Sequence, residues 1–164
     1  MFDFHIDLYR KELRSNIILL MREFGQYVES IDDIKRTEYK KGGAEYFTDK
    51  MIRETQENNG AVFVARIQDK VVGFIGGYVG KQDKDEEMEA VPLTPGIVSE
   101  FFVTASSRGK HIGEKLLQTL EEDLKNKGCD ILRLEVFAPN ILAREFYTKH
   151  DFTERLITLS KSLK

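Results

Sequence analysis

Residues 100–113 read EFFVTASSRGKHIG, an apolar run typical of a β-strand followed by a turn rich in glycine and basic residues. Leucines recur at helical spacing after Gly113, so the turn opens a predicted helix. The first turn of a helix has unpaired N–H groups and the positive end of the helix dipole, which favour a bound phosphate. The turn from Arg108 to Gly113 therefore predicts an anion site, although taken alone it also fits an ordinary connection without a ligand.

The pattern of this turn excludes two common phosphate motifs. The chain has no GxxxxGKS or GxxxxGKT sequence, and no GxGxxG turn with an acidic partner downstream. The turn instead resembles the acetyl-CoA-binding motif of the GNAT N-acetyltransferase superfamily, Arg/Gln-x-x-Gly-x-Gly/Ala. Arg108 and Gly113 match, and His111 stands where the middle glycine is usual. The resemblance implies that the coenzyme's pyrophosphate is held by the turn residues Arg108, Gly109, Lys110, His111, Ile112 and Gly113.

A second block resembles the same family. After a predicted strand, the chain matches the pattern N-x-x-A-x-x-F-Y-x-K-x-G-F at Asn140, Ala143, Phe146, Tyr147, Lys149 and Phe152. Asp151 stands where glycine is usual, and we expect a left-handed conformation there, which Asp tolerates better than most residues. The two blocks with their flanks cover about residues 96–160.

Acetyl transfer to an amine needs a proton acceptor, because an amine with a pKa of about 10.4 is almost fully protonated at neutral pH. Glu100 lies in the strand before the turn, between Val98 and Phe102, where an apolar setting would raise its pKa. It resembles the strand glutamate that is the general base in some members of the family. A solvated carboxylate and a water relay remain alternatives.

Tyr147 is the candidate acid for the departing sulfur. Asn140 precedes it by seven residues, two helical turns, so both side chains project on roughly one face of the predicted helix. A packing role for Tyr147 and a capping role for Asn140 are the alternatives. The resemblance further implies that the coenzyme's pantetheine arm pairs with the main chain of Phe101, Phe102 and Val103, whose side chains alone predict only a core.

The order of elements also fits this family. We expect strands over 2–8, 61–67, 71–79, 96–103, 131–137 and 152–159, and helices over 13–31, 44–57, 113–127 and 140–150. Residues 81–96 are expected to form a long exposed loop. The order β-α-α-β-β-β-α-β-α-β predicts an α/β fold with a mixed, largely antiparallel sheet of six to seven strands and helices on both faces.

Composition limits the partners. The chain has 164 residues, 41% hydrophobic and 32% charged, which suits one domain over 1–164, and its net charge of −3 disfavours nucleic acid and anionic membranes. A single cysteine, Cys129, excludes an intrachain disulfide, and no Cys or His cluster predicts a metal. We expect a cytoplasmic protein with no metal, nucleic-acid or membrane partner.

These features predict an N-acetyltransferase in which a primary amine of a small molecule or peptide directly attacks acetyl-CoA within a ternary complex. A non-catalytic acyl-CoA-binding sensor or partner subunit is the alternative. The acceptor site is expected between the first two helices and the loop after Val79. The identity of the acceptor and the oligomeric state, including a homodimer, stay open.

Overall fold

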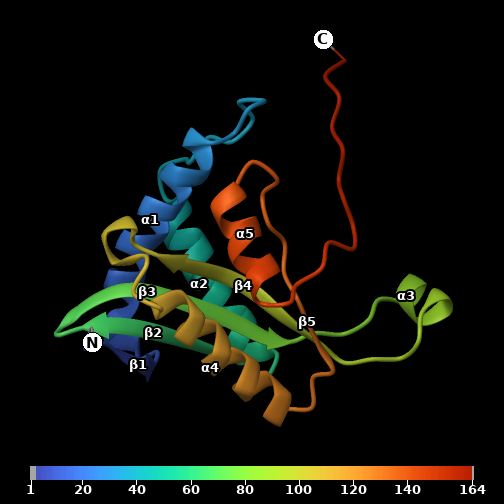
Figure 1. Cartoon of the computed structure of the whole chain (residues 1–164), viewed down its shortest axis with the longest axis horizontal. Helices are drawn as coiled ribbons and strands as arrows, with labels where there is room; N and C mark the ends of the chain where they lie inside the picture. Colours follow the sequence, from blue (N-terminus) through green and yellow to red (C-terminus); the bar gives the residue numbers. More distant parts are fainter. Residues whose placement is uncertain (1–2, 164) are drawn as a thin grey trace.

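The computed structural model describes residues 3–163, which form one sheet with helices on both of its faces (Figure 1). The strands lie in chain order, β1-β2-β3-β4-β5, and all neighbours are antiparallel except β4 and β5, which are parallel. The strands are β1 (His5–Leu8), β2 (Ala61–Ile67), β3 (Lys70–Val79), β4 (Pro95–Val103) and β5 (Ile131–Arg133).

Two hydrophobic layers hold the helices against the sheet. The helices are α1 (Arg14–Ser30), α2 (Gly43–Glu57), α3 (Lys84–Glu89), α4 (Ile112–Asn126) and α5 (Ile141–Lys149), with short 3-10 turns η1 (Lys11–Leu13) and η2 (Ala105–Ser107). Because side chains alternate along a strand, Phe74 of β3 packs with α1 and α2, while Ile75 packs with α4. The sheet is therefore buried on both faces at its centre, and the expected fold class is confirmed.

The C-terminal part of the sheet differs from the expectation. Among the described residues the sheet has five strands rather than six or seven, and the strand expected over 131–137 ends at Arg133. Residues 152–159, expected as a last strand, are not a strand and leave Leu156 and Leu159 93% and 89% exposed. Glu154 pairs with Arg144 of α5, and beyond it the chain runs away from the sheet (Figure 1). A strand-like sequence forms a strand only where a sheet edge offers it partners, and β5 is three residues long.

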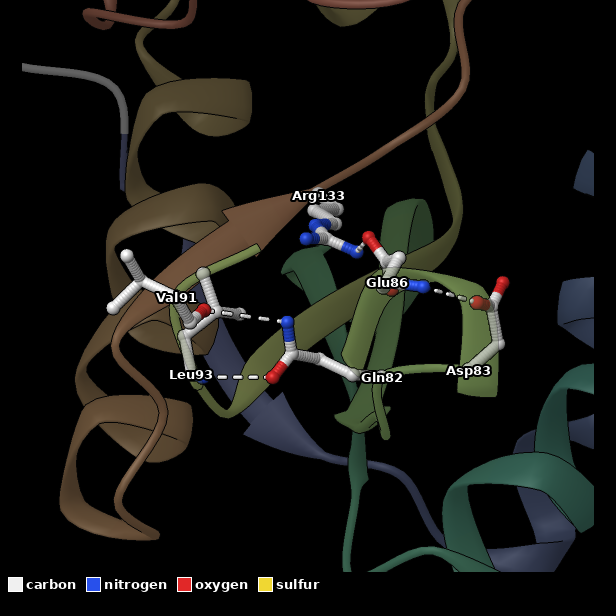
Figure 2. A network of polar contacts seen from close by, with 6 residues as sticks. All are labelled: Gln82, Asp83, Glu86, Val91, Leu93 and Arg133. Atoms are coloured by element: carbon white, nitrogen blue, oxygen red, sulfur yellow. Dashed lines mark hydrogen bonds and ion pairs between the residues drawn. The ribbon is translucent and has the colours of Figure 1, made fainter. Parts of the chain in front are cut away.

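The expected loop over 81–96 also contains structure. Asp83 caps the short helix α3 by accepting a hydrogen bond from the N–H of Glu86, at 2.8 Å (Figure 2). The side chain of Gln82 closes the loop through Val91 and Leu93, and Glu86 forms an ion pair with Arg133 of β5 (Figure 2). Acidic residues in the first turn of α3 favour the helix through its dipole. Among the described residues, no helix is both long enough and apolar enough to span a bilayer.

Candidate active site

A β-bulge in β4 sets the direction of the side chains around Glu100. Gly76 of β3 pairs with Glu100, and Gly77 pairs with Val98, so Ser99 is an extra residue on β4. The hydroxyl of Ser99 donates to the carbonyl of Gly76 at 3.1 Å. Bulges redirect the residues beside them. Here the bulge keeps Val98 and Phe101 on the α4 side and leaves Glu100 facing α2.

Within residues 3–163, one edge of β4 has no strand neighbour over most of its length. β5 pairs only with Pro95, Gly96 and Ile97, although β4 continues to Val103. An unpaired strand edge presents N–H and C=O groups that an extended ligand can use. Phe101, Phe102 and Val103, predicted to bind pantetheine, lie on this stretch, where the carbonyl of Val103 accepts a hydrogen bond from Arg108 Nε at 3.1 Å.

The basic turn follows β4 and opens α4, as the sequence predicts. Gly109 has φ +72°, and a Cβ added there would meet nothing within 4 Å, so the space beside this residue is open. The guanidinium of Arg108 does not extend from the turn but lies over the rings of Tyr27 and Phe102, at 5.3 and 5.7 Å from their centroids. The part of the turn that is open to an anion is therefore the glycine main chain and the N-terminus of α4.

His111 occupies the N-cap of α4 in the left-handed conformation, with φ 61°. This conformation explains why a glycine is favourable at the position. The imidazole is 83% exposed, and its Nδ1 lies 2.8 Å from a carboxylate oxygen of Glu114. The side chain therefore leaves the main chain of the turn accessible.

Asp151 is also left-handed, with φ 63°, as expected from its place in the second block. It ends α5 in a Schellman motif, in which the N–H of Phe152 donates to Tyr147 O and the N–H of Asp151 donates to Thr148 O. The rings of Phe152 and Tyr147 pack with centroids 5.4 Å apart, which is the hydrophobic contact typical of this motif. The end of α5 therefore fixes the position of Tyr147.

Asn140 is nearly buried, with 9% of its surface exposed, and caps α5. Its Oδ1 accepts hydrogen bonds from the N–H of Ala143, at 3.2 Å, and from the hydroxyl of Tyr27, at 3.1 Å. Tyr27 thus joins α1 to α5 while its ring lies under Arg108. No motif includes Tyr27, and its spacing of three residues from Phe24 and seven from Leu20 places it on the apolar stripe of its helix, a position that by itself indicates packing.

The two candidate proton-transfer residues, Glu100 and Tyr147, both have pKa values raised by burial. Burial raises the pKa of Glu100 to about 7, and among its neighbours Lys50 lowers this pKa while Glu54 raises it. Burial, with a further contribution from the charge of Glu100, raises the pKa of Tyr147 to about 12. At neutral pH the carboxyl is therefore about half ionised, as suits a general base, and the phenol keeps its proton, as suits a donor.

The loop after Val79 does not join these residues, contrary to the expectation for the acceptor site. Its helix α3 stands beside β5, away from the turn at Arg108 (Figure 1). The ion pair between Glu86 and Arg133 ties it there. Within residues 3–163, no group of three or more His, Cys, Asp or Glu side chains is arranged to hold a metal.

Comparisons with known proteins show the family and the fold of this chain. An uncharacterized N-acetyltransferase of Methanocaldococcus jannaschii is 28% identical over 139 residues, covering 84% of this chain and 80% of that protein. Two solved structures share the fold. AAC(6')-Iy in complex with the bisubstrate analogue CoA-S-monomethyl-acetylneamine has a TM-score of 0.71 and 14% sequence identity, and the match covers 98% of this chain and 99% of the other. Glucosamine-6-phosphate N-acetyltransferase from Arabidopsis thaliana has a TM-score of 0.65 and 18% identity, and the match covers 99% of each chain. The model of the Acetyltransferase (GNAT) family matches residues 28–152, and this chain therefore belongs to that family.

Proposed function

We propose that this protein transfers the acetyl group of acetyl-CoA to a primary amine by direct attack within a ternary complex. The observation that carries the proposal is the edge of β4 that has no strand neighbour among residues 3–163; it runs from Glu100 to the basic turn, and the ring of Tyr147 lies 6.4 Å between centroids from that of Phe101 on the same strand. A candidate base, a candidate acid and an anion site thus lie along one strand and its two flanking helices. Membership of an acetyltransferase family is consistent with that chemistry.

Each group of residues has one role in binding acetyl-CoA or in positioning the reacting groups. The main chain of Phe101, Phe102 and Val103 pairs with the pantetheine arm, which places the thioester near Glu100 and Tyr147. The turn residues hold the pyrophosphate through the main chain and the N-terminus of α4; they are Arg108, Gly109, Lys110, His111, Ile112 and Gly113. Asn140 holds the start of α5 and so sets the position of Tyr147.

Each proton has a place in this arrangement. Glu100 accepts the proton that the acceptor's ammonium group must lose before its nitrogen attacks. As the new C–N bond forms and the C–S bond breaks, Tyr147 donates its proton to the sulfur, and the second proton that the nitrogen loses in becoming an amide restores the phenol. Acetyl-CoA supplies the activated acyl group, and the chain supplies orientation and proton transfer. The bisubstrate analogue and the glucosamine 6-phosphate of the two structural neighbours favour a small-molecule amine as the acceptor.

Coenzyme A should stabilise the protein against heat, and the variant Gly109→Asp should lose most of this effect. Ligand at about 100 times its Kd adds about 2.7 kcal/mol to the free energy of unfolding. An Asp at position 109 fits the open space there but places a carboxylate against the phosphates. We expect Kd for coenzyme A, measured from the melting temperature as a function of its concentration, to rise at least tenfold.

Gly128→Asp is the matched control, because Gly128 has φ +87° and equally open surroundings at the opposite end of α4. It carries the same strain and the same added charge, and it should keep the affinity of the parent for coenzyme A. If the parent and both variants bound coenzyme A with equal affinity, the turn would not be the phosphate site. No shift with coenzyme A in the parent would contradict the proposed donor.

A further inference from the structure

The helix that carries the candidate acid, α5, packs only lightly against the rest of the fold. None of the described residues 141–149 is buried, and Ile141 and Leu142 at the start of the helix are 53% and 60% exposed. The second half of α5 contacts β4 through Phe101, whose ring centroid lies 5.7 Å from that of Phe146 and 6.4 Å from that of Tyr147. The direction in which Tyr147 points therefore depends on what holds the start of the helix.

The hydroxyl of Tyr27 on α1 holds that start. It donates a hydrogen bond to Oδ1 of Asn140 at 3.1 Å, and the same oxygen accepts the N–H of Ala143 at 3.2 Å. Because Asn140 is only 9% exposed, water has little access to replace a lost bond, and the loss is costly. A hydrogen bond between residues 113 positions apart thus ties the cap of α5 to α1.

The ring of Tyr27 makes a second contact, with the turn that is proposed to hold the pyrophosphate. Its centroid lies 5.3 Å from the guanidinium carbon of Arg108, whose Nε donates to the carbonyl of Val103 at 3.1 Å. The negative face of an aromatic ring attracts such a cation. One turn earlier on α1, a carboxylate oxygen of Glu23 accepts the N–H of Ala105 at 3.4 Å. Two successive turns of α1 therefore contact the stretch between β4 and α4.

We propose that Tyr27 is a positioning residue that aligns the two halves of the active site. Its hydroxyl fixes the start of α5 and so the direction of Tyr147 toward the departing sulfur. Its ring holds Arg108 and so the turn that binds the pyrophosphate of the donor. Tyr27 transfers no proton itself and acts through Asn140 and Arg108. This inference rests on the proposed acetyltransferase activity and adds to it a residue that orients the acid and the donor together.

Two substitutions at this position separate the role of the hydroxyl from that of the ring. Tyr27→Phe removes the hydroxyl and keeps a ring under Arg108. A displacement of about 1 Å at a reacting group costs up to about 100-fold in rate. With spermidine, neamine, glucosamine 6-phosphate and an alanyl peptide as acceptors, we expect Tyr27→Phe to lower kcat about tenfold with the best amine, while Kd for coenzyme A changes less than twofold. Tyr27→Leu should lower kcat as much and also raise Kd for coenzyme A at least threefold.

Ser30→Ala is the matched control, because the hydroxyl of Ser30 donates to the carbonyl of Tyr27 at 2.6 Å within α1. It removes a hydroxyl bond at the same place without affecting α5, and it should change neither kcat nor Kd. A double-mutant comparison separates positioning of the phenol from general loosening of the fold. In the Tyr147→Phe background there is no phenol proton to deliver, so Tyr27→Phe should lower kcat less than twofold there. Loss of kcat by the same factor in both backgrounds would overturn the role of the hydroxyl, and an unchanged Kd in Tyr27→Leu would overturn that of the ring.

Amide hydrogen exchange needs no turnover, so it keeps a failure of this inference apart from a failure of the proposed function. The N–H groups of residues 143–147 should exchange faster in Tyr27→Phe than in the parent and in Ser30→Ala. If the parent acetylated none of the four amines, acetyl transfer to them would be contradicted, and faster exchange in Tyr27→Phe would still support the attachment of α5 by Tyr27. Equal exchange in all three proteins would contradict that attachment.

Discussion

Glu100→Gln should lower kcat/KM for amine acetylation by about 100-fold, the lower range of what a positioned general base contributes. Glutamine keeps the size of the side chain but cannot take the proton of the ammonium group. Glu57→Gln is the control, since Glu57 is an exposed residue at the end of α2. It should retain the activity of the parent.

The pH dependence separates a base from a merely structural carboxylate. Because the pKa of Glu100 is about 7, kcat/KM of the parent should rise tenfold per pH unit below pH 7 and then level off. It should fall again near the pKa of the acceptor amine, about 10.4 for a lysine-like amine, because Glu100 acts on the ammonium form. A rise that continues unbroken to pH 10 in both parent and Glu100→Gln would mean that free amine attacks without this base.

The same raised pKa affects folding stability. A carboxyl whose pKa rises on folding stabilises the folded state when protonated, and this contribution is lost as the pH rises through the folded pKa. The rise from 4.5 to about 7 corresponds to about 3 kcal/mol lost between pH 4.5 and pH 8. Urea titrations should show this loss in the parent and not in Glu100→Gln. If the free energy of unfolding depended on pH in the same way in both proteins, Glu100 would be exposed to solvent in the folded state.

Tyr147→Phe should lower kcat by about 10- to 100-fold and leave the affinity for acetyl-CoA nearly unchanged. The ring contacts with Phe146 and Phe152 are kept, so the variant should fold as the parent does. The loss comes from the proton that the phenol delivers to the departing sulfur. A thioester whose thiol is more acidic depends less on this proton. With such a donor, the difference in kcat between Tyr147→Phe and the parent should therefore be smaller.

Tyr46→Phe is the matched control, since Tyr46 is 60% exposed on α2. It should match the parent in kcat and in both KM values. Equal kcat for Tyr147→Phe and the parent would remove the phenol from the mechanism and leave it the packing role that its aromatic neighbours also allow.

The elements that the sequence predicted well have strong local signals. The leucine stripe of α4 and the basic turn before it are both found in the structure. The left-handed conformation of Asp151 also followed from its place in a recognisable pattern. In each case the deciding interaction lies within a few residues of the position concerned.

What the sequence did not predict depends on distant partners. The length of β5 is set by how far it follows β4, and residues 152–159 find no sheet edge to pair with. Tyr27 meets the site through the hydrogen bond of its hydroxyl to Asn140 at the start of α5, 113 residues along the chain. Contacts between residues that lie far apart along the chain cannot be predicted from the spacing of residues in a single sequence.

Thiol release from acetyl-CoA, with formation of the N-acetyl product followed by mass spectrometry, shows whether this protein is an acetyltransferase. The acceptors are polyamines, aminoglycosides, amino acids and peptide N-termini. We predict that at least one of them gives product and free thiol in equal amounts, at a rate that Glu100→Gln and Tyr147→Phe both reduce at least tenfold. Tight binding of acetyl-CoA without release of thiol to any acceptor would contradict the account and would identify the chain as a non-catalytic acyl-CoA-binding protein.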